Sequence, residues 1–275
     1  MRFVLLVVAV LAAALGSRAA SAAGADKLYV LDCGHISAPD QSRWSPGVNV
    51  GVPLELSDNC YLIHHAQGWF LWDTGLPDAI AANPDGVKGA NGFQLKRSKT
   101  LAAQLQELGV KPSDLKAIAI SHTHPDHIGN VELFPQVMLF VQKAEYEWPG
   151  EGGAPRFNPN HPVTKLDGDY DVFGDGSVMI ISTPGHTPGH VAFTFGRGKD
   201  DAVFVGDMVH TPLQLQHPEL SPRFDVDPVQ AAVTRKQVLE RYCDTDTVCC
   251  TAHFPSPSTG KIRRKGNGFV CEAVS

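Results

Sequence analysis

The stretch Ser121-His122-Thr123-His124-Pro125-Asp126-His127 places three imidazoles and a carboxylate directly after the apolar run 115–120. Imidazole and carboxylate groups are the ligands that zinc and similar ions take in hydrolases. His122 and His124 lie two residues apart, so both side chains project to one side of an extended segment at the end of a strand. The stretch therefore predicts an open, catalytic metal centre.

The same stretch predicts two neighbouring metal ions. Asp126 and His127 follow across a turn, and they can hardly both reach the ion that His122 and His124 hold. The motif is therefore interpreted as two ligand pairs. The absence of cysteine from this cluster argues against a closed thiolate site.

Further ligand candidates follow other apolar runs of the sequence. His186 stands after the run 178–182, in a loop of glycine and proline that places it at the end of a predicted strand. Asp207 and His253 each follow a short apolar run as well. A lone histidine in such a place is usually a polar residue at a sheet edge, but the whole set favours metal ligands.

Five motifs occur in an order that resembles the metallo-β-lactamase superfamily. In chain order they are Asp73-Thr74-Gly75, the HxHxDH cluster at 122–127, Gly185-His186-Thr187-Pro188-Gly189-His190, Gly206-Asp207 and His253. The resemblance spans essentially the whole mature chain. It implies an α/β fold: a four-layer αββα sandwich in which two mixed β-sheets face each other and helices cover the outside.

The resemblance also implies a role for each matching position. Two zinc ions would be bound per chain, by His122, His124 and His186 for the first ion and by Asp126, His127 and His253 for the second. Asp207 would bridge the two ions, and Asp73 would orient a ligating imidazole. His190 would support the site rather than bind metal. Other divalent transition metals suit the same ligands.

Asp207 narrows the function within the superfamily. Metallo-β-lactamases proper carry serine or cysteine around this position, and glyoxalase II and RNA-processing relatives keep the aspartate but work mainly inside cells. The chain looks more like N-acyl-homoserine lactone lactonases and methyl parathion hydrolase-like enzymes, and its segments 28–34 and 59–63 favour the lactonases. The alternative is an organophosphate phosphotriester hydrolase. A β-lactamase or a non-catalytic metal-binding protein has less support.

The implied reaction is the opening of a lactone ring by a hydroxide that bridges the two zinc ions. Asp126, or a water that it holds, would pass a proton to the departing ring alkoxide. Lactonases of this type place a tyrosine three residues after the bridging aspartate, and this chain has His210 there. His210 is predicted either to donate the same hydrogen bond to the substrate carbonyl or only to line the pocket.

Residues 1–22 look like a secretory signal peptide, with Arg2 at the start, an apolar core over 3–15 and a small-residue cleavage site at Ala20-Ser21-Ala22. We therefore expect an exported protein, periplasmic or extracellular, whose hydrolase domain spans 23–275. An uncleaved anchor is the alternative, but no stable membrane partner is expected.

The composition predicts a globular enzyme, because 43% of the residues are hydrophobic and only 19% are charged. The net charge of −6 argues against a nucleic-acid partner. The expected partner is a small-molecule substrate, a lactone or another ester, and a homodimer is left open. Export makes the six cysteines eligible for disulfides. For Cys249 and Cys250, a bridge competes with a pair of buried thiols.

Periodicity and turn residues predict the remaining elements. Strands are expected at 27–31, 60–65, 69–72 and 137–141, and helices at 98–108 and 228–242. The stretches 35–56 and 148–170 lack such periodicity. Long loops of this kind are often functional, so we expect them to wall a substrate pocket. Trp44, Phe93 and Phe157 either line that pocket or pin loops to the core.

Overall fold

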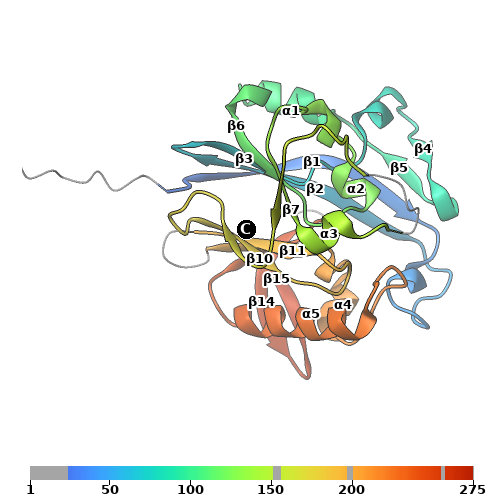
Figure 1. Ribbon diagram of the computed structural model, residues 1–275. Coiled ribbons are helices and arrows are strands. Elements are labelled where there is room, and N and C mark those ends of the chain that lie inside the picture. Colours follow the sequence, from blue (N-terminus) through green and yellow to red (C-terminus); the bar gives the residue numbers. More distant parts are fainter. Residues whose placement is uncertain (1–23, 151–155, 197–200, 255–257, 275) are drawn as a thin grey trace, which may run out of the picture.

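Two β-sheets face each other in this protein, and helices cover their outer faces (Figure 1). The computed structural model describes residues 24–150, 156–196, 201–254 and 258–274, so the predicted signal peptide lies outside the described residues. The predicted four-layer αββα sandwich is confirmed. Within the described ranges, no helix is long and apolar enough to cross a bilayer.

The first sheet has eight strands in the order β4-β5-β1-β2-β3-β6-β7-β8. The strands are β1 (Lys27–Ala38), β2 (Leu54–His65), β3 (Gly68–Trp72), β4 (Val87–Lys88), β5 (Gln94–Lys96), β6 (Leu115–Ala119), β7 (Leu139–Gln142) and β8 (Val163–Leu166). The neighbours from β3 to β8 pair in parallel, and the other pairs are antiparallel. The sheet is therefore mixed, as predicted.

The second sheet has seven strands in the order β15-β14-β13-β12-β11-β10-β9. They are β9 (Tyr170–Asp171), β10 (Val178–Ser182), β11 (Val191–Phe195), β12 (Ala202–Phe204), β13 (Val248–Cys250), β14 (Thr259–Lys265) and β15 (Gly268–Ala273). Only the pair of β12 and β13 is parallel among the described strands of this sheet. This sheet is also mixed.

The α-helices are α1 (Leu101–Glu107), α2 (Pro125–Ile128), α3 (Lys143–Glu147), α4 (Pro212–Gln216) and α5 (Pro228–Tyr242). Short 3-10 helices are η1 (Gln41–Arg43), η2 (Asp78–Ala82), η3 (Ala90–Gly92), η4 (Pro112–Asp114), η5 (Val131–Leu133) and η6 (Gly206–Met208). The predicted helix 228–242 is confirmed with the same bounds. The helix predicted at 98–108 is shorter, because Thr100 caps it by accepting a hydrogen bond from the backbone of Ala103.

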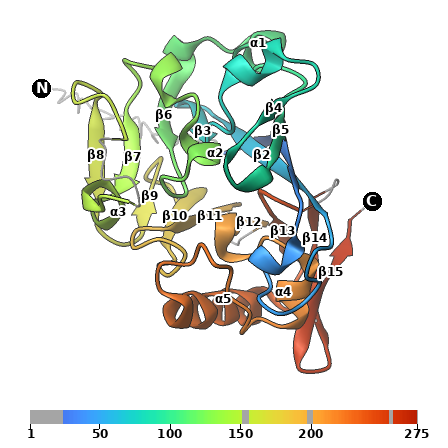
Figure 2. The ribbon, with the colours of Figure 1, turned by 90° about the vertical axis from the view of Figure 1, so that its right-hand side faces the viewer.

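Aromatic side chains from both sheets form the central core. The ring of Trp72 lies 4.4 Å from that of Phe193, and the ring of Tyr61 lies 4.2 Å from that of Phe204. Such rings bury large apolar areas and favour tilted contacts. On the outside, α1 lies on the first sheet and α5 on the second (Figure 2). Leu101 and Leu105 of α1 and Leu239 and Tyr242 of α5 make the packing contacts.

Two stretches that the sequence predicts to be irregular contain strand residues. β1 continues to Ala38 and β2 begins at Leu54, so only the middle of 35–56 is a loop. Likewise, β8 lies within 148–170. At the end of β1 the residues do alternate, because Ile36 and Ala38 are buried while His35 and Ser37 are more exposed. Runs of three or four residues are too short for a firm prediction from periodicity, and it is pairing with distant strands that satisfies their backbone groups.

One disulfide joins Cys33 of β1 to Cys60 of β2, with a Cα–Cα distance of 5.8 Å. Cys249 and Cys250 of β13 are free, buried thiols, so of the two alternatives for this pair the structure has the buried thiols and not the bridge. The physical reason is strand alternation. Cys249 packs in the cluster beneath α5, whereas Cys250 faces the core between the sheets.

Candidate metal centre

Each predicted donor lies at or shortly after the end of a strand. His122 and His124 lie beyond β6, His186 beyond β10, Asp207 beyond β12 and His253 beyond β13. Asp126 and His127 lie in α2, where Pro125 occupies the first helical position, which does not need a backbone N–H. The structure brings all seven donors into one cluster.

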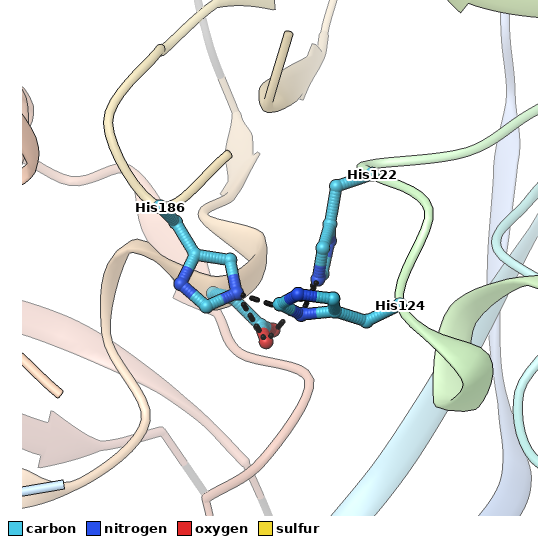
Figure 3. A group of neighbouring side chains, drawn as sticks. His122, His124 and His186 are labelled. Carbon is cyan, nitrogen blue, oxygen red and sulfur yellow. Dashed lines mark hydrogen bonds and ion pairs between the residues drawn. The ribbon is translucent and has the colours of Figure 1, made fainter. Parts of the chain in front are cut away.

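The first donor group consists of His122, His124, His186 and Asp207. Figure 3 shows its three imidazoles pointing toward one another. His124 Nδ1 lies 2.9 Å from His122 Nε2 and 3.1 Å from His186 Nε2. Asp207 Oδ2 lies 3.6 Å from His122 Nε2 and 3.4 Å from His186 Nε2.

The second donor group consists of Asp126, His127 and His253. The Nε2 atoms of His127 and His253 lie 3.3 and 3.0 Å from Asp207 Oδ1. Each of these nitrogens is also 3.9 Å from a carboxylate oxygen of Asp126. Asp207 therefore stands between the two groups, with one oxygen facing each.

These separations fit tetrahedral metal coordination. Zinc bonds of about 2.0–2.1 Å to nitrogen and oxygen would set neighbouring donors about 3.3 Å apart. The measured donor separations scatter around that value. In addition, the buried atoms His127 Nε2 and Asp207 Oδ1 have no hydrogen bond of ordinary geometry among the described residues. Buried polar atoms without partners are costly, and a cation between the groups would satisfy both.

The second donor group is held from the first sheet. Asp73, which follows β3, contacts His127 Nδ1 at 2.9 Å and accepts a hydrogen bond from the backbone of Ser121 at 2.6 Å. The carbonyl of Ser57 in β2 accepts a hydrogen bond from His253 Nδ1 at 2.8 Å. Because a carbonyl can only accept, this contact leaves Nε2 of His253 free to bind a metal.

In the first donor group, His186 is held by a buried ion pair next to α5. Asp225, in the segment before α5, contacts His186 Nδ1 at 2.8 Å. The guanidinium of Arg235 lies 3.3 Å from the second oxygen of Asp225, and both side chains are fully buried. The imidazole of His186 is thereby fixed with Nε2 toward His124 and Asp207.

His190 supports the cluster in a different way. Its Nε2 accepts a hydrogen bond from the backbone of Asp207 at 3.1 Å, and its Nδ1 lies 2.9 Å from the hydroxyl of Thr183. The chain comes so close here that a Cβ on Gly206 would lie 2.7 Å from His190 Nε2, and Gly206 has a φ of +51°. Glycine adopts this conformation without a steric penalty.

Burial and charge divide the imidazoles into two kinds. Burial lowers the pKa of His122 well below its usual value, and burial together with His186 lowers the pKa of His124 to about 3. Burial also disfavours charge on His186 and His253, but Asp207 raises the pKa of each to about 9. Burial likewise disfavours charge on His127, but Asp207 and Asp73 raise its pKa well above the usual value. A metal ion that bound these three rings would displace their protons.

Comparison with known proteins agrees with this geometry. The sequence profile of the Metallo-beta-lactamase superfamily matches residues 54–253, a span that contains all seven donors. The chain belongs to this superfamily. It is accordingly a metal-dependent hydrolase, with a histidine and aspartate metal-binding cluster where the superfamily motifs lie.

Two curated relatives in this superfamily are N-acyl homoserine lactonases named AttM. The one from Azorhizobium caulinodans is 27% identical over 83% of this chain and 93% of its own length. The one from Agrobacterium fabrum is 34% identical over 61% of this chain and 70% of its own length. A solved N-acyl homoserine lactone hydrolase, with N-hexanoyl-L-homoserine at its catalytic metal centre, gives a TM-score of 0.71. It is 26% identical, over 84% of this chain and 94% of that chain.

A cavity of about 320 Å³ opens onto the donor cluster of this superfamily member. Its walls include the apolar side chains of Ile36, Trp44, Leu56, Phe93, Leu95 and Phe224. Trp44 stacks on Phe93 at 5.8 Å and contacts Phe224 at 5.6 Å, so the three rings form one wall. For Phe157 the structure has the other alternative, because this ring packs beside Tyr146 and pins its loop to the core beneath the helices.

His210 lies between the cavity and the donors. Its Nε2 is 3.0 Å from Asp207 Oδ2, and its ring stacks on that of His253 at 5.5 Å. Trp44 covers it from the cavity side, with ring centres 6.5 Å apart. Burial lowers the pKa of His210, although Asp207 opposes the shift, so the ring is neutral at pH 7 and can carry one N–H toward the site.

Sequence reasoning missed three residues that hold the donors in place: Asp225, Ser57 and Glu145. Asp225 and Ser57 contact donor imidazoles directly. Glu145 bonds the backbone of two donor loops. None of them stands in a motif or after a strand end, and each acts on a segment distant in the sequence. No local signal could have identified them.

Proposed function

We propose that this protein is an N-acyl-homoserine lactone lactonase that opens the lactone ring by hydrolysis. The observation that carries the proposal is the apolar cavity beside the donor cluster, because it offers space for an acyl chain where a lactone ring would meet the metal centre. The curated and solved relatives that share the superfamily and bear this activity in their names support the same substrate class.

We propose further that the centre holds two zinc ions. His122, His124 and His186 would bind the first, Asp126, His127 and His253 the second, and Asp207 both. The separations of the donor atoms and the two unpartnered buried atoms support this arrangement. Two such ions would supply Lewis acidity and would lower the pKa of water toward neutrality.

His210 and Asp126 would supply the hydrogen bond and the proton transfer that the reaction needs. The neutral His210 would donate a hydrogen bond to the carbonyl oxygen of the lactone, where negative charge develops during attack. Asp126 lines the cavity, and burial would raise its pKa, but His127 and His253 lower it. Asp126 is therefore a carboxylate at pH 7. It would accept a proton from the attacking water and pass it to the departing ring alkoxide.

We also propose that the protein is exported and acts in the periplasm or outside the cell. The signal-like residues 1–22 motivate this proposal, and the Cys33–Cys60 disulfide supports it, since disulfides persist in oxidising compartments. Fractionation of cells that express the full chain tests it. Protein that stays in the cytoplasm with residues 1–22 attached would contradict it.

The activity is tested with purified, zinc-loaded protein on N-butanoyl- and N-decanoyl-homoserine lactone, beside methyl paraoxon and nitrocefin. Lactone turnover should exceed turnover of the other two substrates, and metal analysis should find two ions per chain. Trp44→Ala should raise KM for the decanoyl substrate more than for the butanoyl one, because it removes part of the apolar wall. Efficient cleavage of methyl paraoxon with little lactone turnover would assign the protein to the phosphotriester hydrolases instead.

A further inference from the structure

Glu145 of α3 is a buried carboxylate that the reaction does not use. Its side chain is only 1% exposed. Its Oε1 accepts hydrogen bonds from the backbone N–H of Thr123 at 2.8 Å and from the Thr123 hydroxyl at 2.6 Å. Its Oε2 accepts a hydrogen bond from the backbone N–H of Gly189 at 3.0 Å. One carboxylate therefore joins two segments of chain.

Both segments carry donors of the first group. Thr123 stands between His122 and His124, and Gly189 follows His186 in the same loop. The second loop also sits directly on α3, because a Cβ on Gly189 would lie 2.4 Å from the backbone nitrogen of Glu145. The carboxylate thus fixes the distance between the two loops.

The free-energy cost of burying a carboxylate indicates a specific role for Glu145. A buried carboxylate is costly unless hydrogen bonds satisfy it, and hydrogen bonds to a charged acceptor are stronger than those between neutral groups. Arg156 adds a weaker contact, with its guanidinium nitrogen 3.9 Å from Oε1. Among the described residues, Glu145 makes no hydrogen bond or ion pair with Asp126, His127 or His253, and its hydrogen bonds go to residues next to donors of the first group.

We propose that Glu145 is a positioning residue that sets the spacing of the two loops and thereby the affinity and geometry of the first metal position. The inference rests on the proposed two-ion centre. It goes beyond that proposal because it assigns the first position a support of its own, carried by a side chain that touches neither metal ligand atoms nor substrate.

The test compares Glu145→Gln with Glu147→Gln, a matched control on the same helix. Glu147 is exposed and pairs with Lys143 and Lys165. The readouts are zinc affinity by chelator competition and the visible absorption spectrum of the cobalt-loaded protein. In Glu145→Gln, one of the two ions should bind about 10–100-fold more weakly, the range expected when a group that orients ligands is lost. The cobalt spectrum should change, and Glu147→Gln should match the wild type.

A milder substitution keeps the inference testable if Glu145→Gln fails to fold. Thr123→Val removes the hydroxyl but keeps the backbone bond to Glu145, so it should weaken the same ion by a smaller factor. Equal weakening of both ions would overturn the inference, and so would unchanged affinities with a lowered melting temperature. If the wild type binds one ion only, the two-ion proposal fails. The inference on Glu145 then still requires that Glu145→Gln weaken this ion.

Discussion

The two donor groups share Asp207 but are supported by different elements of the fold. The second group is held by Asp73 and by the backbone of Ser57, which belong to or directly follow strands of the first sheet. The first group is held by the side chains of Asp225 and Glu145, which lie outside the strands. The supports of the second group thus lie in or next to strands, whereas those of the first group lie in a loop and in a short helix.

The difference bears on how firmly each ion would be held. Strands in the middle of a sheet open only when much of the fold opens, whereas loops and short helices open locally. Exposure does not separate the groups, because each has one partly exposed donor at the cavity, His124 in the first and Asp126 in the second. Because the supports do differ, we expect the first ion to exchange faster than the second. Substitutions that act on one donor group or on both test this expected difference in exchange rate.

Asp207→Asn should have the largest effect, because it weakens both groups at once. Its carboxylate faces donors of each group. We expect lactone hydrolysis to fall by more than about 100-fold, beyond the effect of losing a residue that only orients ligands. Kinetics and metal analysis measure this, with the exposed Asp85→Asn as a control. If the variant kept both ions and its activity, Asp207 would not be a metal ligand.

His210→Phe should rank next, since it keeps a ring at the cavity wall but removes the N–H beside Asp207. The loss of one donor to a developing oxyanion costs about 10²–10³-fold in kcat. His210→Tyr supplies a hydroxyl and should retain much more activity. Steady-state kinetics of both variants decide the question. Equal activity in the two would mean that His210 only lines the pocket.

Asp73→Asn and Asp225→Asn form a pair that should act mainly on different groups, because Asp73 contacts His127 directly and reaches His122 only through the hydroxyl of Ser121. Each should lower zinc affinity by about 10–100-fold, but for different ions. Asparagine suits position 73, where the backbone has a φ of +57°. Chelator competition and cobalt spectra should show complementary changes in the two variants. The same spectral change in both would mean that the groups are not independently supported.

Asp58→Asn should have the smallest effect, on stability near the second group. Burial, and then repulsion from Asp126, raises the pKa of Asp58 to about 8. Between pH 3.8 and about 8 the folded chain retains a proton that the unfolded chain loses, so this residue makes stability fall as pH rises.

The measurement is the melting temperature of metal-free protein at pH 5 and pH 8. Asparagine can still accept the hydrogen bond from the backbone of Leu76 that Asp58 accepts at 2.8 Å. The variant should gain stability relative to wild type as pH rises, by a few degrees, where about 1 kcal/mol corresponds to 2–4 °C. A gap between the two proteins that is the same at both pH values would contradict the assigned pKa.

The donors could be predicted from the sequence because each stands at or near a strand end within a recognisable motif. The two sheets and four layers were predicted from the family resemblance, and α5 from its local pattern. Among the supporting residues, Asp73 and His190 belong to motifs and were predicted, but Asp225 and Glu145 act through contacts that only the folded chain creates. Likewise, Phe157 and Trp44 are similar aromatic residues in loops of similar composition. Only packing decides that one faces the core and the other the cavity.

The hydrogen bond between Ser57 and His253 joins residues 196 positions apart. Closing so long a loop is entropically costly, and contacts of this range tend to form late in folding. The donors of the first group end at Asp207 and its support Asp225 follows soon after, whereas the second group needs His253 near the end of the chain. A growing or partly folded chain can therefore present one metal position before the other. A metal ion at the second position would therefore indicate that the segment of His253 has already packed against Ser57 of β2.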